Sequence, residues 1–204
     1  MSIAILDYGV GNLRSVQKAL EHVGGKDVVI TSEPAAACSA DRVILPGVGA
    51  FEAAASRLRQ SGLDDVVRET VASGKPLLGI CVGMQLLLTR GFEMGEWDGL
   101  DIVPGDVLKF DTPGLKIPQI GWNSVVPRGD SPLLRGIPPD MMFYFVHSFY
   151  CRVAEPSCVA GETEYGITYC SVIAKNNVHA AQFHPEKSGR AGLAFLRNFT
   201  ELPS

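Results

Sequence analysis

The chain has 204 residues, of which 46% are hydrophobic and 20% are charged, with a formal net charge of −4 at pH 7. This length is sufficient for one α/β domain with a substantial core, and the composition is that of an ordinary globular protein. The acidic balance and the lack of a basic run argue against nonspecific nucleic-acid binding. The N-terminus has no basic region typical of a signal peptide, and no apolar stretch approaches membrane-spanning length.

Cysteine usage indicates a reducing compartment. The five cysteines form an odd set, without the close spacing of a disulfide framework and without a C-x-x-C pair. We therefore expect a cytoplasmic protein with no zinc knuckle. Cys81 lies in a motif of its own. The other four cysteines are most simply interpreted as core residues, and they are Cys38, Cys151, Cys158 and Cys170.

In the first half of the chain, predicted strands and helices alternate. This alternation predicts an α/β fold with an open, mostly parallel sheet and helices on both faces. Short apolar strands are expected at 3–6, 28–31, 42–45 and 76–80, and helices at about 12–22, 51–60, 63–73 and 84–89.

The second half changes character, because Gly and Pro punctuate it and strands follow one another with few helices. We expect these strands to add antiparallel pairs to the sheet. The poorly patterned stretch 111–140 is interpreted as surface loop with short strands. We find no repeat, linker or low-complexity segment, so residues 1–204 are predicted to form a single domain. Strands are expected at 142–146, 149–153, 170–174 and 179–183, and a closing helix at about 189–199.

The most informative stretch is Gly79-Ile80-Cys81-Val82-Gly83. It has the G-x-C-x-G form of a nucleophile elbow, with a predicted strand before it and an apolar helical stretch after it. The glycines permit a sharp turn, and a sulfur at a helix N-terminus is in a position that favours the thiolate. The alternative is that Cys81 is a small buried apolar residue, as free cysteines usually are. A general base elsewhere in the chain would favour the interpretation of Cys81 as a catalytic nucleophile.

A candidate base lies in the segment Gln182-Phe183-His184-Pro185-Glu186, at the end of a predicted strand. His184 can take the thiol proton, Glu186 can orient the ring and stabilise the imidazolium, and Pro185 restricts the backbone between them. A histidine at a strand end is more often a surface or capping residue, so this motif gains weight only together with the elbow. Because the carboxyl ends of strands in an open sheet meet in one crevice, we expect His184 to lie near Cys81.

Two glycine-rich turns also follow predicted strands. We expect the turn Pro46–Phe51 to supply the backbone amide of Val48 to an oxyanion hole, whose second amide is that of Val82. A phosphate-binding loop or a simple tight turn are the alternatives. The turn Gly9–Arg14 begins like a dinucleotide fingerprint but lacks its third glycine, so NAD is not expected.

The sequence does not predict a metal site. His179, His184, Glu186 and Cys170 lie close together but lack the spacing of zinc ligands, and strand alternation would place the two histidines on opposite faces. His147 lies between two predicted strands, where it either lines the crevice or has a structural role. We therefore expect no metal and no cofactor.

The elbow, extended to Gln85, and the segment 182–186 resemble the class I (triad) glutamine amidotransferases. The elbow alone does not distinguish subfamilies, but a combination of motifs spanning Asp7 to Gly189 is specific. It resembles the family of glutaminase subunits of imidazole glycerol phosphate synthase, through the segments Asp7–Val16, Pro46–Phe51, Gly121–Asn123, Phe143–Ser148 and His184–Gly189.

The resemblance implies a flavodoxin-like fold and hydrolysis of L-glutamine to L-glutamate and ammonia. It implies that Cys81 forms a glutamyl thioester, that His184 transfers protons and that Glu186 orients His184. The residues that match the substrate-holding positions of the family are Gly49, Gln85, Glu93, His147, Ser148 and Phe149.

The resemblance also implies a partner, a (β/α)₈ cyclase subunit that forms a heterodimer with the glutaminase. That partner consumes the ammonia and makes imidazole glycerol phosphate and AICAR in histidine biosynthesis. Candidates for the face turned toward the partner are Asn12, Tyr144 and Lys187. One position departs from the family pattern, because Gln119 stands where relatives commonly carry histidine.

Two alternatives to this glutaminase remain open. The chain could be a related cysteine hydrolase, such as another triad amidotransferase or a protease-like enzyme of the same fold, and substrate preference would separate these. It could also be a noncatalytic regulatory or binding subunit. The intact set of Cys81, His184 and Glu186 argues against that second alternative.

Overall fold

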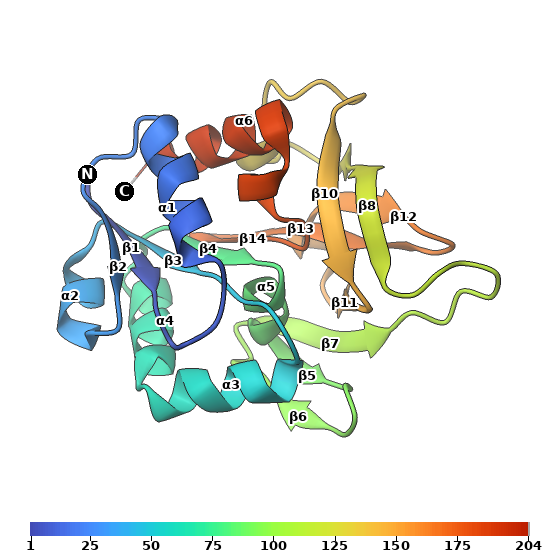
Figure 1. The fold of residues 1–204 in the computed structure, drawn as a ribbon, viewed down its shortest axis with the longest axis horizontal. Coiled ribbons are helices and arrows are strands. Elements are labelled where there is room, and N and C mark those ends of the chain that lie inside the picture. Colours follow the sequence, from blue (N-terminus) through green and yellow to red (C-terminus); the bar gives the residue numbers. More distant parts are fainter. Residues whose placement is uncertain (204) are drawn as a thin grey trace.

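A computed structural model of the protein describes residues 1–203. Within these residues, the central sheet has twelve strands, and five neighbouring strands form a parallel half (Figure 1). Because neighbouring strands in this half run in the same direction, their carboxyl ends lie along one edge. In spatial order they are β2 (Val28–Thr31), β1 (Ile3–Leu6), β3 (Arg42–Leu45), β4 (Leu77–Ile80) and β14 (Val178–Ala181).

Helices cover both faces of the parallel half, which is why its inner strands consist mainly of buried apolar residues. Two helices that contact each other, α1 and α6, lie on one face, and α3 and α4 lie on the other (Figure 1). The short α5 follows β4 directly, and α2 packs against α4. Their bounds are α1 (Leu13–His22), α2 (Pro34–Ser39), α3 (Phe51–Gln60), α4 (Leu63–Ala72), α5 (Val82–Leu86) and α6 (Gly189–Thr200).

The other half of the sheet is mostly antiparallel and continues from β14. In order it contains β13 (Thr168–Lys175), β11 (Phe149–Val153), β7 (Val103–Lys109), β5 (Leu88–Gly91) and β6 (Trp97–Asp98), with β5 parallel to β7.

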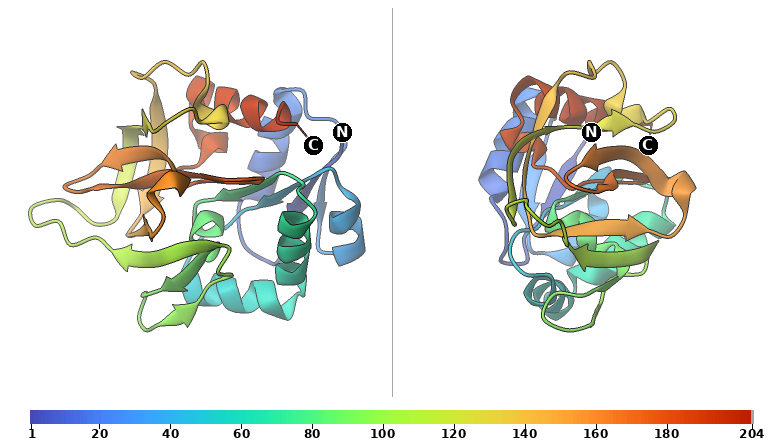
Figure 2. Two further views of the ribbon diagram at one scale, coloured as in Figure 1. Left: turned by 180° about the vertical axis from the view of Figure 1, so that it is seen from behind. Right: turned by 90° about the vertical axis from the view of Figure 1, so that its right-hand side faces the viewer.

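Two strands branch from this half, and a separate antiparallel pair stands beside it (Figures 1 and 2). The branch consists of β12 (Val159–Glu164) and β9 (Val126–Pro127), and the pair consists of β8 (Gln119–Ser124) and β10 (Met142–His147). Short 3₁₀ turns are η1 (Pro132–Leu134), η2 (Pro156–Cys158) and η3 (Pro185–Lys187). The expected α/β fold, with parallel strands first and antiparallel strands in the C-terminal half, is confirmed.

The largest difference from the sequence-based expectation follows the elbow. The apolar run 84–89 is not one helix, because α5 ends at Leu86 and β5 begins at Leu88. Every residue from Met84 to Leu88 is buried, so the run has no polar face whose period would distinguish a helix from a strand. The carbonyls of Leu86, Leu87 and Leu88 accept hydrogen bonds from amides within 100–103, and this non-local pairing takes the place of further helical bonds.

Other differences concern strands and one cysteine. β7 and β12 lie outside the predicted strands, whereas the stretch 111–140 contains the short strands β8 and β9, as expected. Cys38, expected in the core, is only half-buried, with its Sγ 3.2 Å from the carboxylate of Glu69. The other cysteines are buried, and all five are free thiols. None of the helices in residues 1–203 is long and apolar enough to cross a membrane.

Candidate active site

Cys81 occupies the turn between β4 and α5, at the carboxyl end of a buried parallel strand. Its backbone has φ 55° and ψ −112°, a conformation that L-residues rarely adopt. The flanking glycines allow the turn to pack. A Cβ at Gly83 would overlap the carbonyl oxygen of Leu45 on β3, and a Cβ at Gly79 would lie 2.9 Å from the carbonyl oxygen of Gly83. The motif therefore folds as a strained strand–turn–helix that places the sulfur beyond the strand end.

His184 follows β14, the neighbour of β4 in the sheet, and this pairing brings it to Cys81. The ring interacts with the Cys81 side chain, and its Nδ1 lies 2.8 Å from Oε1 of Glu186. Burial opposes the charged ring, but its interactions with Cys81 and Glu186 outweigh this effect and raise the pKa of His184 to about 9. The side chains of His184 and Glu186 are only 4% and 2% exposed, so their contact is shielded from water.

A cavity of about 310 Å³ joins these groups to other residues that the sequence marked. Segments far apart in the chain meet here, beyond the carboxyl ends of β3, β4 and β14. Glu186 is outside the lining, because it contacts His184 instead, and Asn12 and Tyr144 do not line the cavity either. The lining contains Cys81, His184 and Lys187 together with Val48, Gly49, Val82, Gln85, Glu93, His147, Ser148 and Phe149.

The glycine-rich turn after β3 packs directly onto the elbow. A Cβ at Gly47 would lie 2.6 Å from the amide nitrogen of Gly83, so a larger residue would separate the two segments. The turn brings Val48 into the cavity lining beside Val82. The assignment of the Val48 and Val82 amides to an oxyanion hole stays a prediction.

Tyr8 fixes the beginning of this turn, and sequence reasoning assigned it no role. Its buried hydroxyl donates a hydrogen bond to the carbonyl of Pro46. Burial, and then the charge of nearby Cys81, raise the pKa of Tyr8, so the hydroxyl keeps the proton that it donates. A single tyrosine after a strand has no spacing that would have marked this function in the sequence.

The polar residues of the cavity are held by hydrogen bonds within the protein. Glu93 accepts a bond of 2.7 Å from the amide of Phe51, at the first turn of α3. Nδ1 of His147 lies 2.7 Å from the carbonyl oxygen of Phe149, and its Nε2 lies 3.2 Å from the hydroxyl of Tyr169. Burial lowers the pKa of His147 to about 4, so this ring is neutral at pH 7.

Gln119, which departs from the family pattern, is buried on β8 opposite His147 in the β8–β10 ladder. Its side chain lies 2.9 Å from the hydroxyl of Tyr169, the same hydroxyl that contacts His147. Gln119 therefore belongs to a buried hydrogen-bond network behind the cavity.

The residues expected to face a partner lie at or near the surface. Lys187 and Asn12 are exposed and Tyr144 is half-buried. The Nζ of Lys187 lies 5.9 Å from the centre of the Tyr144 ring, and the ring of Trp122, which is 54% exposed, lies 5.9 Å from the same ring. Lys187 also lines the Cys81 cavity, whereas Asn12 lines a different hollow next to α1.

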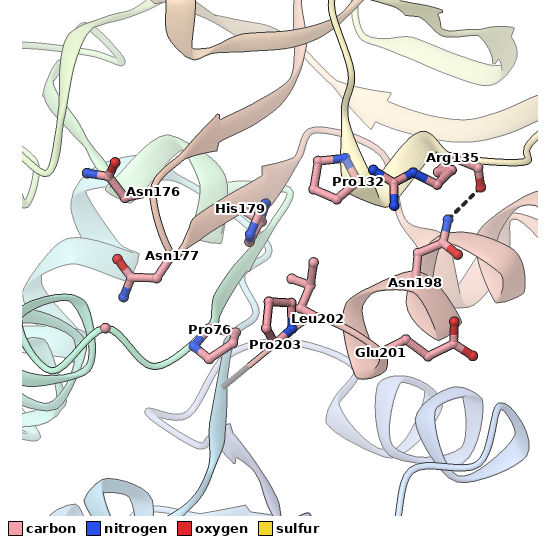
Figure 3. A pocket seen from close by; sticks show the side chains of 11 residues that line it. Pro76, Pro132, Arg135, Asn176, Asn177, His179, Asn198, Glu201, Leu202 and Pro203 are labelled. Carbon is pink, nitrogen blue, oxygen red and sulfur yellow. Dashed lines mark hydrogen bonds between the residues drawn. The ribbon is translucent and has the colours of Figure 1, made fainter.

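A second cavity, of about 600 Å³, is larger, but its lining includes neither Cys81 nor His184 (Figure 3). It lies at the opposite ends of the same strands, where Pro76 precedes β4 and His179 is the second residue of β14, and it extends to the end of α6. His179 and His184 therefore line different cavities and do not converge on a common ligand. Burial lowers the pKa of His179 to about 4, and its Nδ1 has no hydrogen-bond partner among residues 1–203.

Comparison with known proteins decides the family. Residues 4–202 match the family described as "Glutamine amidotransferase class-I". The chain is also 50% identical over 201 residues to "Imidazole glycerol phosphate synthase subunit HisH" of Chlorobaculum tepidum, covering 98% of this chain and 100% of that protein. The chain belongs to the HisH family of class-I glutamine amidotransferases. A HisH relative from Methanothermobacter thermautotrophicus is 48% identical over 202 residues, covering 98% of each chain.

Solved structures share the fold of this HisH-family chain at low sequence identity. "Structure of PurLQS from Thermotoga maritima" has a TM-score of 0.74 at 16% identity, covering 98% of this chain and 97% of that one. "Crystal structure of glutamine amidotransferase" has a TM-score of 0.72 at 19% identity, covering 98% of this chain and 100% of that one. At these identities the likeness concerns the fold alone.

Proposed function

We propose that this HisH-family chain hydrolyses L-glutamine to L-glutamate and ammonia at Cys81. We further propose that it delivers the ammonia to a cyclase subunit that makes imidazole glycerol phosphate and AICAR in histidine biosynthesis. The observation that carries the proposal is the contact of His184 with both Cys81 and Glu186 at the edge of a cavity. The full-length similarity to subunits of imidazole glycerol phosphate synthase supports the same reaction.

The proposed reaction begins with the proton shared between Cys81 and His184. Because its pKa is about 9, His184 is protonated at neutral pH and can hold the proton that the thiol gives up. The thiolate attacks the carboxamide carbon of glutamine, and the C=O bond pair moves to oxygen. The amides of Val48 and Val82 would stabilise this oxyanion. His184 then gives its Nε2 proton to the amide nitrogen, the C–N bond breaks, and ammonia leaves a glutamyl thioester on Cys81.

A water molecule completes the cycle. His184, now neutral, takes a proton from the water as the oxygen attacks the thioester carbon. The second tetrahedral intermediate expels the Cys81 thiolate and gives glutamate, so that glutamine and water become glutamate and ammonia. Glu186 accepts the Nδ1–H bond throughout and keeps Nε2 directed at the reacting atoms.

The remaining polar lining is proposed to hold the amino-acid head group of glutamine. This assignment concerns Gly49, Gln85, Glu93, His147, Ser148 and Phe149, which line the cavity together. Glu93 and His147 are each tied to the backbone by a hydrogen bond of 2.7 Å, so their positions are set before a substrate arrives. Such preorganisation reduces the entropy cost of binding.

Ammonia released into water at neutral pH becomes mostly ammonium, which is not nucleophilic, so the proposed function requires a shielded route to a second site. A separate cyclase subunit, forming a heterodimer with this chain, would provide that site. The face that the cyclase subunit contacts is proposed to include three residues. They are the exposed Lys187, the neighbouring Tyr144, and Asn12 near α1.

The test measures glutamate release from L-glutamine by the purified chain, alone and with the candidate cyclase together with its nucleotide substrate. Turnover should vanish in Cys81→Ala and persist in Cys38→Ala, which changes a thiol outside the cavity. Synthesis by the complex from added ammonium salts should survive Cys81→Ala. Turnover of peptides or esters in place of glutamine would favour a related cysteine hydrolase. No turnover in a formed complex would favour a noncatalytic regulatory subunit.

A further inference from the structure

The side-chain amide of Gln182 contacts the sulfur of Cys81, although no pattern in the sequence marked Gln182 for a role. Gln182 comes directly after β14, just before Phe183 and His184, and it is completely buried. Its Nε2 lies 3.8 Å from Sγ of Cys81, within reach of an N–H···S hydrogen bond. Within residues 1–203, this sulfur is the partner that satisfies the buried nitrogen. The nucleophile therefore has a second polar neighbour besides His184.

The orientation of the Gln182 amide follows from its other neighbour, Gln85. A glutamine oxygen can only accept hydrogen bonds and a glutamine nitrogen can only donate them, so turning the amide over exchanges the two roles. Nε2 of Gln85 donates to Oε1 of Gln182 at 3.1 Å and to the carbonyl oxygen of Phe149 at 3.2 Å. A backbone carbonyl can only accept, so Gln85 has to present its nitrogen to Phe149.

His147 strengthens this anchor. Its Nδ1 also faces the Phe149 carbonyl, at 2.7 Å, and must carry a proton to bond there. With the Phe149 carbonyl fixed and Gln85 oriented by it, Gln182 has to present its oxygen to Gln85 and its nitrogen to Cys81. The reversed amide would set two N–H groups against each other and an oxygen against the sulfur. A chain of hydrogen bonds that starts at a backbone carbonyl thus directs an N–H group at the nucleophile.

We propose that Gln182 is a further catalytic residue, whose N–H group stabilises the thiolate of Cys81. The inference rests on the proposed role of Cys81 as nucleophile. A hydrogen bond to a charged acceptor is considerably stronger than one to a neutral thiol, so the donor favours ionisation of the sulfur. Because Gln182 is buried, water does not compete for this bond. The same donor also favours departure of the thiolate when the thioester is hydrolysed.

The experiment measures the rate at which iodoacetamide alkylates Cys81 as a function of pH, without glutamine or a partner. Peptide mapping follows Cys81 and the half-buried Cys38 in the same sample, so Cys38 serves as an internal reference. Gln182→Met keeps the length of the side chain but removes the donor. We expect the pH profile of Cys81 alkylation to move up by about one unit, which lowers the rate about tenfold at pH values below its midpoint, with Cys38 unchanged. Gln17→Met, which removes a part-buried amide that bonds to the Val28 carbonyl outside the cavity, should leave the Cys81 profile unchanged.

A second measurement covers the case in which Gln182→Met does not fold. In the unaltered protein, the ¹⁵N-labelled side-chain NH₂ signal of Gln182 should shift with pH in parallel with the reactivity of Cys81. It should lose that shift in Cys81→Ala. An unchanged Cys81 profile in a folded Gln182→Met variant, or an NH₂ signal that does not respond to ionisation of the thiol, overturns the inference. Neither readout involves glutamine. Absence of glutaminase activity would therefore overturn the proposed function, whereas the alkylation and NMR measurements test the role of Gln182 separately.

Discussion

Nδ1 of His184 lies 2.8 Å from the carboxylate of Glu186, although only Pro185 separates the two residues in the chain. The turn η3 makes this contact possible, and Ser188 closes it. The Ser188 hydroxyl donates to the carbonyl of His184 at 2.6 Å and accepts a bond of 2.9 Å from the amide of Tyr144. The base and its orienting carboxylate are thus one local unit, which a neighbouring strand places beside Cys81.

Replacing Glu186 with glutamine tests this unit. The amide cannot stabilise the imidazolium as a carboxylate does, so we expect the glutaminase kcat to fall by about a hundredfold or more. Because the bond to Glu186 helps to raise the pKa of His184, that pKa should fall from about 9 toward its ordinary value. Steady-state kinetics and an NMR titration of His184 measure the two effects. Glu164→Gln, at an exposed position, should change neither, and full activity in Glu186→Gln would remove Glu186 from the mechanism.

Tyr8→Phe tests the support of the glycine-rich turn. The change leaves the carbonyl of Pro46 without its buried donor, which we expect to cost about 1–3 kcal/mol of unfolding free energy. Since the same turn carries Val48, kcat should fall more than KM rises. Urea unfolding and glutaminase kinetics check both effects. Tyr165→Phe is the matched control, because it removes a tyrosine bond of 2.7 Å to the Lys116 carbonyl at an exposed site. Equal effects of the two variants would contradict a special role for Tyr8.

His179 should make the protein sensitive to acid. Burial lowers its pKa from 6.5 to about 4, so between these values the unfolded chain binds a proton that the folded chain does not. Its contribution to stability is therefore complete above pH 6.5 and is lost as the pH falls through 4, by an amount on the order of 3 kcal/mol. Urea unfolding at about pH 7 and about pH 4.5 should show a smaller loss in His179→Gln than in the unaltered protein. The exposed His22→Gln should behave like the unaltered protein, and identical losses in all three would refute the assignment.

Gly83→Ala tests the packing of the elbow against β3. The added methyl group would overlap the carbonyl oxygen of Leu45, and that backbone cannot move without disturbing the parallel sheet. We expect a loss of roughly 3 kcal/mol or more in unfolding free energy, together with loss of glutaminase activity. Thermal unfolding measures the first effect. Glu52→Ala, at an exposed position of α3, should be nearly neutral, and a stable, active Gly83→Ala protein would show that the turn can relax.

Local patterns in the sequence predicted the parts of the protein that short-range physics controls. Continuous apolar runs between turn residues gave the bounds of β1, β2 and β3 as the structure has them, because backbone sterics and burial act over a few residues. The elbow and the segment 182–186 were visible for the same reason, since glycine and proline spacing fixes their turns. The sequence by itself therefore determined the fold class and named Cys81, His184 and Glu186 as candidates.

The tertiary structure alone decided which of these parts meet. The pairing of β14 with β4 brings His184 to Cys81, and the orientation of Gln85 by the Phe149 carbonyl directs the Gln182 amide at the sulfur. Pairing of the Leu86–Leu88 carbonyls with residues 100–103 ends α5, and contact with Tyr169 places Gln119 in a buried network. Each of these features depends on groups that are distant in the chain. Because such contacts have no period or spacing along the sequence, only the packed structure determines them.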